Sequence, residues 1–452
     1  MADEEFVDQS SQLRKRREVK IALLGAGTVG AQVARLLVQQ HDVLCARAGV
    51  DLKLIGIAVR NVNAPRDPAI DRELLTDRPD ELIARADLVI ELIGGVDLPL
   101  KLVRQALESG ASVVTGNKAL LATHGPELYE LAAAHDADLY YEAAVAGAVP
   151  VVYGLRESLA GDQVNAIFGI LNGTTNFILD EMTRNGMDFD EALSLAQELG
   201  YAEADPSVDI DGLDVAAKIA ILASLAFHTR VALDDVYVEG IRSITDEDIA
   251  SARRAGYIVK LIATARRKAE GIELCVAPTL LPEDHPLANI HGSFNAILIE
   301  AESAGRVMFY GRGAGGAPTA SAVLSDVVAA ANKKVVGGRA PAELVYGNLP
   351  ILDSQEASAC YYLKVMVNDE AGALALITHV FAQHSVSISS LRQRPLYVSE
   401  GRKLDAKMSK NLVYLTVVTH EARNKDIAAV VDDLSGVEGV QKVVRVMRVE
   451  DE

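Results

Sequence analysis

A glycine-rich turn near the start of the chain constrains the fold more than any other feature. An apolar run at residues 19–24 leads directly into GAGTVG, and an apolar pattern with helical period follows at residues 31–40. In such a strand, turn and helix, Gly25 permits the tight turn, Gly27 lets the backbone approach a pyrophosphate, and Gly30 lets the helix pack on the strand. The spacing therefore predicts a dinucleotide site whose turn contacts are Gly25, Ala26, Gly27, Thr28, Val29 and Gly30.

The alternation of strand and helix continues beyond this turn. Further apolar runs, at residues 52–59, 88–93, 112–115 and 138–142, alternate with stretches of helical period, among them residues 100–109 and about 127–134. Elements in this order form a parallel sheet with right-handed crossovers. We therefore predict an α/β chain that begins with a disordered tail (residues 1–18) and a Rossmann-type dinucleotide-binding domain (residues 19–150).

The rest of the chain predicts two more domains. Residues 151–335 have a mixed pattern, typical of an α+β substrate-binding and dimerisation domain, whose last helix, at about 319–331, can return to the nucleotide domain. This region is predicted to contain helices near 190–199 and 212–227 and strands near 165–171, 273–278 and 296–301. Residues 336–358 contain several Gly and Pro residues and are predicted as a linker. From 359 to 452 the elements follow the order βαββαβ of a ferredoxin-like domain, which a charged stretch at 392–410 interrupts.

Composition excludes several classes of partner. The net charge of −19 disfavours binding to nucleic acid or to an anionic membrane surface. Cys45, Cys275 and Cys360 lie far apart without a CxxC pair, which argues against a disulfide framework and a structural zinc site. No apolar run reaches the length of a membrane span, and the polar N-terminus lacks the apolar segment of a secretory signal. We therefore expect a cytoplasmic protein.

The end of the second predicted strand bears on the choice of cofactor. An acidic residue there would bind the ribose 2′-hydroxyl of NAD, whereas Arg60 can pair with the 2′-phosphate of NADP. An arginine at a strand end is also commonly a solvated surface residue. NADP is the favoured cofactor on this reading, with NAD as the alternative.

Several longer motifs resemble those of homoserine dehydrogenases across nearly all of residues 19–335. They are, in order, ELIGG, TGNKALLA, YEAAVAGAVP, LNGTTNFIL, GYAEADPSVDIDGLDVAAK and GRGAGGAPTASAV. The remainder of the chain resembles an ACT domain, a common regulatory appendage in this family. The resemblance implies an NAD(P)-dependent interconversion of L-homoserine and L-aspartate 4-semialdehyde in threonine, methionine and isoleucine biosynthesis. It also implies a homo-oligomer, a dimer or a tetramer.

The implied reaction moves a hydride and a proton, so it needs a positioned acid or base at the substrate oxygen. The resemblance makes Lys218 this proton carrier and places Lys118 at both cofactor and substrate. Asp214 and Lys218 stand four residues apart on a predicted helix, a spacing that fits an ordinary salt bridge or a substrate-site pair. The resemblance makes Asp214 a substrate-binding or lysine-orienting group and Glu203 the binder of the substrate amino group. Asp205 and Asp209 are near in sequence, and spacing alone does not rank the three acids.

Small residues are candidates for the remaining contacts. Gly173 and Thr174, within NGTT, can receive the substrate carboxylate or form an ordinary turn with an N-cap. Gly313, in the second glycine cluster, is a further expected cofactor contact.

A monovalent cation site is also implied. Glu142, Val145, Gly147 and Val149 match the family's cation site, with Na⁺ as the expected ion. A loop rich in Gly and Ala can aim hard carbonyl oxygens at such an ion, or can serve only as a tight domain junction. The nine histidines show no HxH or HExxH spacing, so none is assigned to catalysis.

The third domain carries the expected regulatory site. Asn368, Asp369 and Gly372 lie at its first strand-to-helix turn, where ACT domains resemble one another in binding amino acids between paired domains. L-threonine is the expected effector, and a dimerisation domain without a ligand is the alternative.

Two other readings compete with the dehydrogenase. One is another amino-acid-pathway dehydrogenase of the same architecture, but the semialdehyde type needs a nucleophilic cysteine in a catalytic turn, and no cysteine here lies in such a motif. The other is a non-catalytic sensor of nucleotides and amino acids. The joint presence of Lys118, Glu203, Asp214 and Lys218 argues against that sensor.

Overall fold

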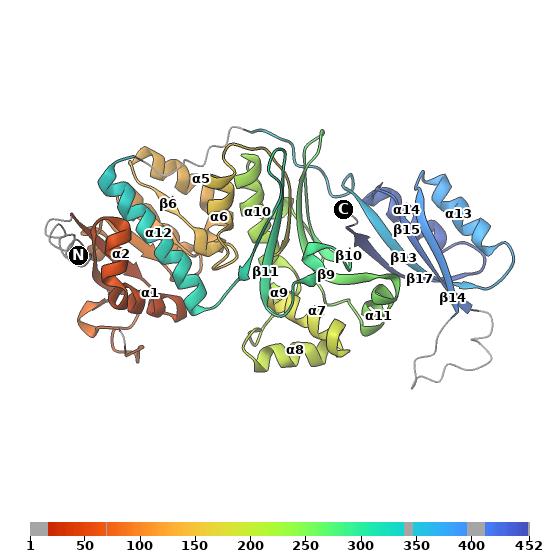
Figure 1. Ribbon diagram of the computed structural model, residues 1–452, viewed down its shortest axis with the longest axis horizontal. Coiled ribbons are helices and arrows are strands. Elements are labelled where there is room, and N and C mark those ends of the chain that lie inside the picture. Colours follow the sequence, from red (N-terminus) through yellow and green to blue (C-terminus); the bar gives the residue numbers. More distant parts are fainter. Residues whose placement is uncertain (1–16, 69, 339–346, 396–411, 451–452) are drawn as a thin grey trace, which may run out of the picture. The chain divides into compact units, whose positions relative to one another are not determined.

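The computed structural model describes residues 17–68, 70–338, 347–395 and 412–450 (Figure 1). They form two compact units. Unit 1 contains the residues up to Asn165, Ala217–Leu233 and Asn295–Asn348, and unit 2 contains Ala166–Ala216, Asp234–Phe294 and the residues from Leu349 onward. Nearly all of the predicted tail, part of the predicted linker and most of the 392–410 stretch lie outside the described residues. Within the described ranges, no helix combines the length and apolar character needed to cross a membrane.

Unit 1 is built around a parallel six-stranded sheet, as the strand and helix alternation predicts. Its strand order is β3-β2-β1-β4-β5-β6, so the order reverses between β1 and β4, the usual ligand-binding position in such sheets. The strands are β1 (Glu18–Leu24), β2 (Asp51–Ala58), β3 (Leu75–Thr76), β4 (Leu88–Glu91), β5 (Ser112–Thr115) and β6 (Leu139–Tyr140). All five predicted strands are present, and the two-residue β3 is added.

A late helix belongs to the core of this unit. α12 (Gly316–Val336) packs beside α1 (Thr28–Gln39) and α2 (His41–Ala48), and all three share one apolar cluster with β1 and β2 (Figure 1). Val323 and Val327 of α12 are fully buried in that cluster. α12 therefore packs in unit 1, although much of the preceding chain lies in unit 2.

Two helices of unit 1 differ from the sequence prediction. α2 was not predicted. α5 (Lys118–Ala134) begins nine residues before the predicted helix at residues 127–134. Pro126 lies inside α5 and breaks the helical pattern, whereas the real start is marked by Asn117, whose side chain accepts a hydrogen bond from the N–H of Leu120. α3 (Pro79–Ile83) and α4 (Asp97–Glu108) complete the helices that accompany the first five strands.

Unit 2 contains long antiparallel strands and several helices. β10 (Ile272–Pro282) pairs with β9 (Tyr257–Arg267), which pairs in turn with β7 (Val164–Ile170). The helices are α7 (Gly173–Asn185), α8 (Phe189–Glu198), α9 (Ser207–Ile210), the start of α10 (Leu213–Phe227) and α11 (Asp246–Ala255). The predicted helices at 190–199 and 212–227 correspond to α8 and α10, while α7, α11 and β9 were not predicted.

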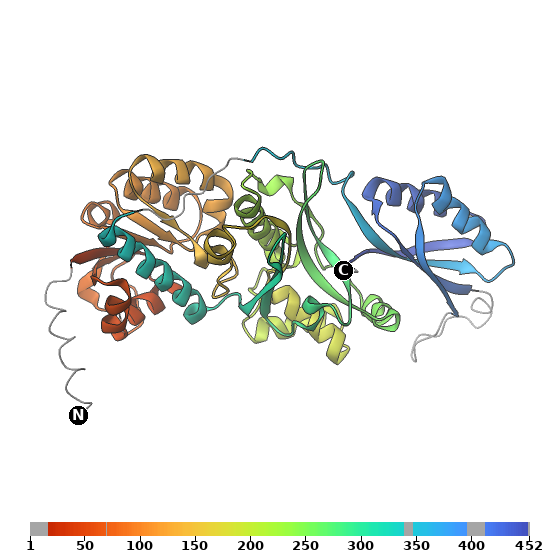
Figure 2. The same cartoon turned by 45° about the horizontal axis from the view of Figure 1, so that its top comes forward.

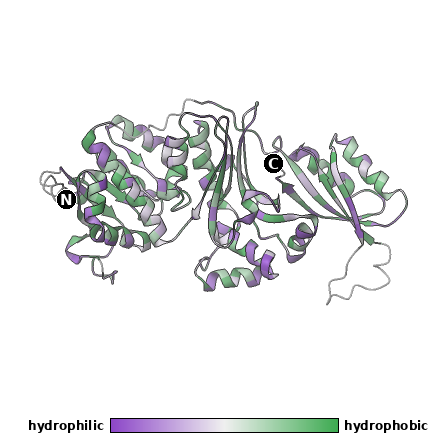
Figure 3. Cartoon of the chain, viewed as in Figure 1, coloured by the Kyte–Doolittle hydropathy of each residue, from purple (hydrophilic) through white to green (hydrophobic). Residues whose placement is uncertain are grey.

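The C-terminal part of unit 2 has the predicted βαββαβ succession. Its sheet has the order β17-β13-β15-β14, and α13 and α14 share one apolar cluster with it. The two helices lie along one side of this sheet (Figure 2). These elements are β13 (Ser358–Asn368), α13 (Ala373–Gln383), β14 (Ile388–Pro395), β15 (Leu412–Thr419), α14 (Asn424–Leu434) and β17 (Val440–Val449), with a short β16 (Ala422–Arg423). The helices carry both hydrophobic and hydrophilic residues (Figure 3), as expected when one face packs on a sheet.

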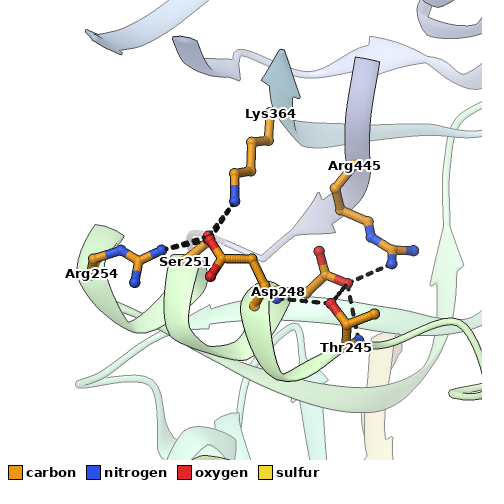
Figure 4. A network of polar contacts seen from close by, with 7 residues as sticks. Thr245, Asp248, Ser251, Arg254, Lys364 and Arg445 are labelled. Atoms are coloured by element: carbon orange, nitrogen blue, oxygen red, sulfur yellow. Dashed lines mark hydrogen bonds and ion pairs between the residues drawn. The ribbon is translucent and has the colours of Figure 1, made fainter. Parts of the chain in front are cut away.

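Charged side chains attach this sheet to α11. Lys364 of β13 is buried and donates hydrogen bonds to Glu247 (2.8 Å) and Ser251 (2.6 Å), and Arg445 of β17 pairs with Asp248 (Figure 4). Asp248 also accepts hydrogen bonds from Thr245, the N-cap of α11. Because Lys364 and Asp248 are buried, loss of either partner would leave a charge without compensation, which is costly.

Candidate functional site

The glycine turn has the close backbone packing that a dinucleotide site requires. Gly25 has φ +100°, and a Cβ at this position would lie 2.7 Å from the carbonyl oxygen of Leu92. A Cβ on Gly30 would lie 2.1 Å from the carbonyl oxygen of Gly25, so only glycine lets α1 approach the turn. A Cβ on Gly27 would meet no atom within 4 Å, so this position faces open space at the start of α1. The N–H groups of Thr28 and Val29 belong to the first turn of α1, where an anion is favoured.

Polar side chains organise the loops after β4 and β5. Glu91 is fully buried, and its carboxylate accepts hydrogen bonds from the N–H of Ile93 (2.8 Å) and from the hydroxyl of Thr115 (2.6 Å). Asn117 donates to the carbonyl oxygen of Gly95 (2.7 Å) and caps α5, whose first residue is Lys118. This network fixes the backbone from which Lys118 extends. Sequence reasoning missed Glu91, Thr115 and Asn117, although they lie in the quoted motifs ELIGG and TGNK.

Two arginines follow β2. Arg60 is exposed two residues after the end of the strand, which fits both the predicted cofactor contact and an ordinary surface arginine. Arg66 reaches back to the glycine turn and donates to the carbonyl oxygens of Ala26 and Asn61, both at 3.3 Å. Arg66 was missed because its loop carries no motif; only the structure brings its guanidinium beside the turn.

The NGTT segment forms the N-terminus of α7 and collects two carboxylates. Asn172 is the N-cap of the helix, and its side-chain oxygen accepts the N–H of Thr175 (2.9 Å). Its amide nitrogen donates to Asp209 (2.8 Å) and to Asp214 (2.9 Å). The hydroxyl of Thr174 donates to Asp209 as well, at 3.1 Å. Asp209 therefore joins the predicted residues Asp214 and Thr174 in one network within unit 2.

Buried contacts hold α7 in place. Lys260 is 1 % exposed and donates to the side chain of Asn176 (2.9 Å) and to the carbonyl oxygen of Ile290 (2.6 Å). Burial lowers the pKa of Lys260 to about 8. A Cβ on Gly173 would lie 2.7 Å from the carbonyl oxygen of Ser293, so a glycine is required where α7 begins. The predicted substrate residue Gly173 therefore also has a packing role.

The two predicted groups of α10 are buried. Asp214 is 3 % exposed and Lys218 is 8 % exposed, and they stand four residues apart on the helix. α10 contributes Asp214 to unit 2 and Lys218 to unit 1. Glu203 and Asp205 are exposed in the segment before α9, and Asp205 accepts hydrogen bonds from Ser207, which lower the pKa of the Asp205 carboxyl. Glu203 is therefore an accessible carboxylate, whereas Asp205 organises its own turn.

The predicted cation loop places the buried carboxyl group of Glu142 near a second one, that of Asp326 on α12. Glu142 accepts the N–H groups of Val152 (3.0 Å) and Tyr153 (2.8 Å), and its own N–H donates to Asp326 (3.0 Å). Burial raises the pKa of Glu142 to about 7, and burial together with the Glu142 charge raises the pKa of Asp326 to about 8. The buried Arg156 guanidinium lowers both pKa values and lies 5.5 Å from the centre of the Tyr153 ring.

The end of this loop packs against the second glycine cluster. Gly147 has φ +55°, and a Cβ on it would lie 2.4 Å from the carbonyl oxygen of Gly313. Val145 and Val149 are fully buried beside it. Gly147 and Gly313, predicted for the cation and the cofactor respectively, are therefore neighbours in unit 1.

The predicted effector turn connects β13 to α13. The side chain of Asn368 accepts a hydrogen bond from Gln441 (3.1 Å), and Asp369 accepts one from Gln393 (2.8 Å). Gly372 has φ +97° and is the N-cap of α13. Asp369 and Gly372 are exposed, so the turn is accessible in this chain.

A cavity of about 700 Å³ lies elsewhere in unit 1. It is lined by residues of α5, by residues 155–164 and by the end of α10, including Tyr129, Arg156 and Ser224. None of the predicted cofactor or substrate residues lines it. The cavity is therefore separate from the predicted cofactor and substrate residues.

Comparison with known proteins identifies close relatives. Residues 25–142 match the family model for the NAD binding domain of homoserine dehydrogenase, and residues 150–328 match the homoserine dehydrogenase model. The homoserine dehydrogenase of Corynebacterium glutamicum is 50 % identical over 439 residues, which cover 96 % of each chain. That of Mycobacterium leprae is 48 % identical over 441 residues, covering 96 % of this chain and 98 % of the relative.

Solved structures of homoserine dehydrogenases also resemble this chain. The homoserine dehydrogenase of Thiobacillus denitrificans superposes with a TM-score of 0.88 at 36 % identity, covering 97 % of this chain and 100 % of that chain. A hyperthermophilic archaeal homoserine dehydrogenase in complex with NADPH superposes with a TM-score of 0.60 at 29 % identity, covering 70 % of this chain and 98 % of that chain.

The second and third glycines of the turn, Gly27 and Gly30, should respond differently to substitution. Gly27→Val should leave thermal stability near the wild-type value but weaken dinucleotide binding roughly tenfold or more, because the added side chain fills space that a pyrophosphate needs. Gly30→Val should lower both stability and binding, because its Cβ would overlap the Gly25 carbonyl. Calorimetric binding and thermal unfolding measure the two effects. Unchanged binding by Gly27→Val would place the dinucleotide elsewhere.

Proposed function

The chain belongs to the homoserine dehydrogenase family, as an oxidoreductase of amino-acid biosynthesis with an NAD-binding domain, and from this premise we propose roles for its individual residues. The observation that carries these roles is that two features occur together in one chain. One is a glycine turn with space for a pyrophosphate, and the other is a buried lysine and aspartate on one helix, α10. The reaction interconverts L-homoserine and L-aspartate 4-semialdehyde. The nicotinamide cofactor, when bound, supplies or accepts the hydride.

Lys218 is the group that exchanges the proton with the substrate oxygen. Its side chain is buried on α10, and its amine has a proton to donate when the aldehyde is reduced. When the alcohol is oxidised, the same amine receives the hydroxyl proton. Lys118 begins α5 directly after the buried Asn117 network, which holds it at the carboxyl end of β5, the edge where parallel sheets bind ligands.

Carboxylates of unit 2 bind the substrate amino group. Asp214 already accepts a hydrogen bond from Asn172, so its orientation is fixed before the substrate arrives. The exposed Glu203 supplies a second carboxylate for the ammonium group. The N–H groups at the start of α7, beginning at Gly173, receive the substrate carboxylate, since they lie at a helix N-terminus. Thr174 supports them through its bond to Asp209.

NADP is the proposed cofactor. Gly25, Ala26 and Gly27 form the turn that approaches the pyrophosphate, and the exposed Arg60 at the end of β2 binds the 2′-phosphate. Arg66, already bonded to the turn, adds a second positive charge there. The archaeal relative in complex with NADPH is in keeping with this choice.

A monovalent cation, with Na⁺ favoured, is proposed for the loop of Glu142, Val145, Gly147 and Val149. The residues fit such an ion because Glu142 and Asp326 are two buried acids beside one arginine, Arg156. One further positive charge would compensate the cluster, and it would stabilise the junction after β6 without taking part in the reaction.

The C-terminal segment is proposed as an ACT domain that senses L-threonine at Asn368, Asp369 and Gly372. Support comes from its βαββαβ order and from an accessible turn that begins α13, whose Leu374 and Leu376 are exposed and offer an apolar surface for pairing. A ligand at this turn can influence the rest of unit 2, because Lys364 and Arg445 of the same sheet bond to α11. Such regulation requires two states with different affinities for the effector.

Removal of the proton carrier should abolish most of the activity. Lys218→Ala should lower kcat by roughly 10²–10⁴-fold while leaving NADPH affinity near normal, since a general acid is worth that much. Lys101→Ala, which removes an exposed lysine of α4, is the matched control and should be silent. Steady-state assays with homoserine measure this, and a variant with more than about a third of wild-type activity would exclude Lys218 from the mechanism.

Cofactor preference should depend on Arg60. Arg60→Ala should lower kcat/KM for NADPH about tenfold or more relative to NADH, because a charge-assisted bond to the 2′-phosphate is lost. Arg85→Ala, another exposed arginine of unit 1, should leave the ratio unchanged. If the Arg60 variant loses both activities equally, another group selects the cofactor.

The cation should stabilise the wild-type protein through Glu142. When Na⁺ replaces choline at constant ionic strength, the Tm of the wild-type protein should rise, because Na⁺ compensates a buried carboxylate. Glu142→Gln should remove that response, and Glu157→Gln, at an exposed position nearby, should retain it. If neither Na⁺ nor K⁺ changes the wild-type Tm, the loop does not bind a cation and serves only as a domain junction.

Threonine inhibition should depend on the effector turn. Asp369→Ala should raise the inhibitory threonine concentration about tenfold or more with little change in uninhibited kcat, whereas Asp432→Ala on α14 should behave as wild type. Point variants are preferable to truncation, because removing β17 would leave Asp248 and Glu273 without Arg445 and Arg448. Wild-type enzyme that ignores millimolar threonine would refute the proposal.

A further inference from the structure

Three side chains with metal-ligand chemistry meet on the surface of unit 1, apart from the residues assigned above. Cys45 Sγ lies 3.4 Å from His41 Nε2 and 3.8 Å from Asp51 Oδ1, and His41 Nε2 lies 3.2 Å from Asp51 Oδ1. Cys45 is 4 % exposed, while the other two side chains are each 44 % exposed. The three ligand atoms therefore form a small triangle with one side open to solvent.

Local chain geometry brings the triangle together. His41 and Cys45 are four residues apart on α2, so they lie on the same helix face. α2 ends at Gly49, which has φ +75° and lets the chain reverse into β2, where Asp51 is the first residue. The segment HDVLCARAGVD thus supplies all three ligands, although it contains none of the CxxC or HExxH spacings that usually reveal a zinc site.

The triangle has the dimensions of one face of a zinc tetrahedron. With ligand distances of about 2.0–2.3 Å, tetrahedral zinc separates neighbouring sulfur, nitrogen and oxygen ligands by about 3.4–3.6 Å. The three observed separations lie between 3.2 and 3.8 Å. A metal ion would thus reach all three atoms with shifts of a few tenths of an ångström, and water would take the fourth position.

Neighbouring groups support the ligands in the manner of a metal site. Nδ1 of His41 lies 3.4 Å from the carboxylate of Asp42, so a proton on Nδ1 leaves Nε2 free to face the triangle. Carboxylates commonly orient metal-binding histidines in this way. The N–H of Leu52 donates to Cys45 Sγ at 3.2 Å, so the sulfur is held against the start of β2 by a backbone contact.

We propose that His41, Cys45 and Asp51 form a site for Zn²⁺ that fastens α2 to the start of β2. A thiolate and a carboxylate supply two negative charges to match the ion, and neutral imidazole completes the set. The thiolate selects zinc over Mg²⁺ or Ca²⁺, which prefer oxygen ligands alone. The site stabilises the nucleotide-binding unit because Leu44, Cys45 and Ala48 of α2 pack in its core.

The test uses full-length, untagged protein stripped of metal by a chelator and then desalted. Co²⁺ titration should give one equivalent of binding with a sulfur-to-metal charge-transfer band, and Zn²⁺ should displace it and raise Tm. Cys45→Ser should lose the band, whereas Cys360→Ser, at a cysteine of the C-terminal sheet that is not fully buried, should retain it.

His41→Gln and Asp51→Asn change partly exposed side chains, so they test the site even if Cys45→Ser folds poorly. Each should weaken metal binding about tenfold or more, in line with the loss of a ligand, while His384→Gln in α13's C-cap should not. The proposal is overturned if wild-type protein shows no charge-transfer band. It is equally overturned if the band survives Cys45→Ser, or if the His41 and Asp51 variants bind the metal as tightly as wild type.

Discussion

Backbone-to-backbone packing at the carboxyl end of β1 is the constraint on which the nucleotide-binding unit depends. Gly25 lies against the carbonyl of Leu92, and Gly30 lies against the carbonyl of Gly25, with no room for a Cβ at either position. This contact lets α1 begin directly at the turn, with its N–H groups directed at an anion. The loops after β4 and β5 then meet the same edge, held by the buried carboxylate of Glu91. The glycine turn and the start of α5, where Lys118 stands, are thus held at the same edge of the sheet.

In unit 2, polar groups are buried around the motifs predicted to bind the substrate. Asn172 satisfies the start of α7 and at the same time orients Asp209 and Asp214, so one side chain couples helix capping to the presentation of carboxylates. Lys260 bonds to α7 from the neighbouring strand β9. Buried polar groups are costly unless every partner is present, so this arrangement is rigid and specific.

Charge also joins the C-terminal sheet to the rest of unit 2. Lys364, Arg445 and Arg448 each meet an acid on α11 or β10, and β17 adds a short parallel pairing to β10. Attachment through a few ion pairs and a short strand contact is easier to alter than a continuous apolar core.

The sequence by itself determined the order of five strands of the parallel sheet in unit 1, the glycine turn, the shared face of Asp214 and Lys218 on α10, and the βαββαβ succession at the C-terminus. These features are local, because periodicity and turn chemistry act within a few residues. The sequence pattern did not predict the start of α5, because Pro126 breaks the helical period inside that helix. It also did not predict α7, whose first residues fit an ordinary turn with an N-cap as well. Only the tertiary structure decided that Glu142 lies against Asp326, that Arg66 reaches the glycine turn and that Asp51 joins His41 and Cys45. Those pairings depend on how helices and loops pack, which no local pattern in the chain records.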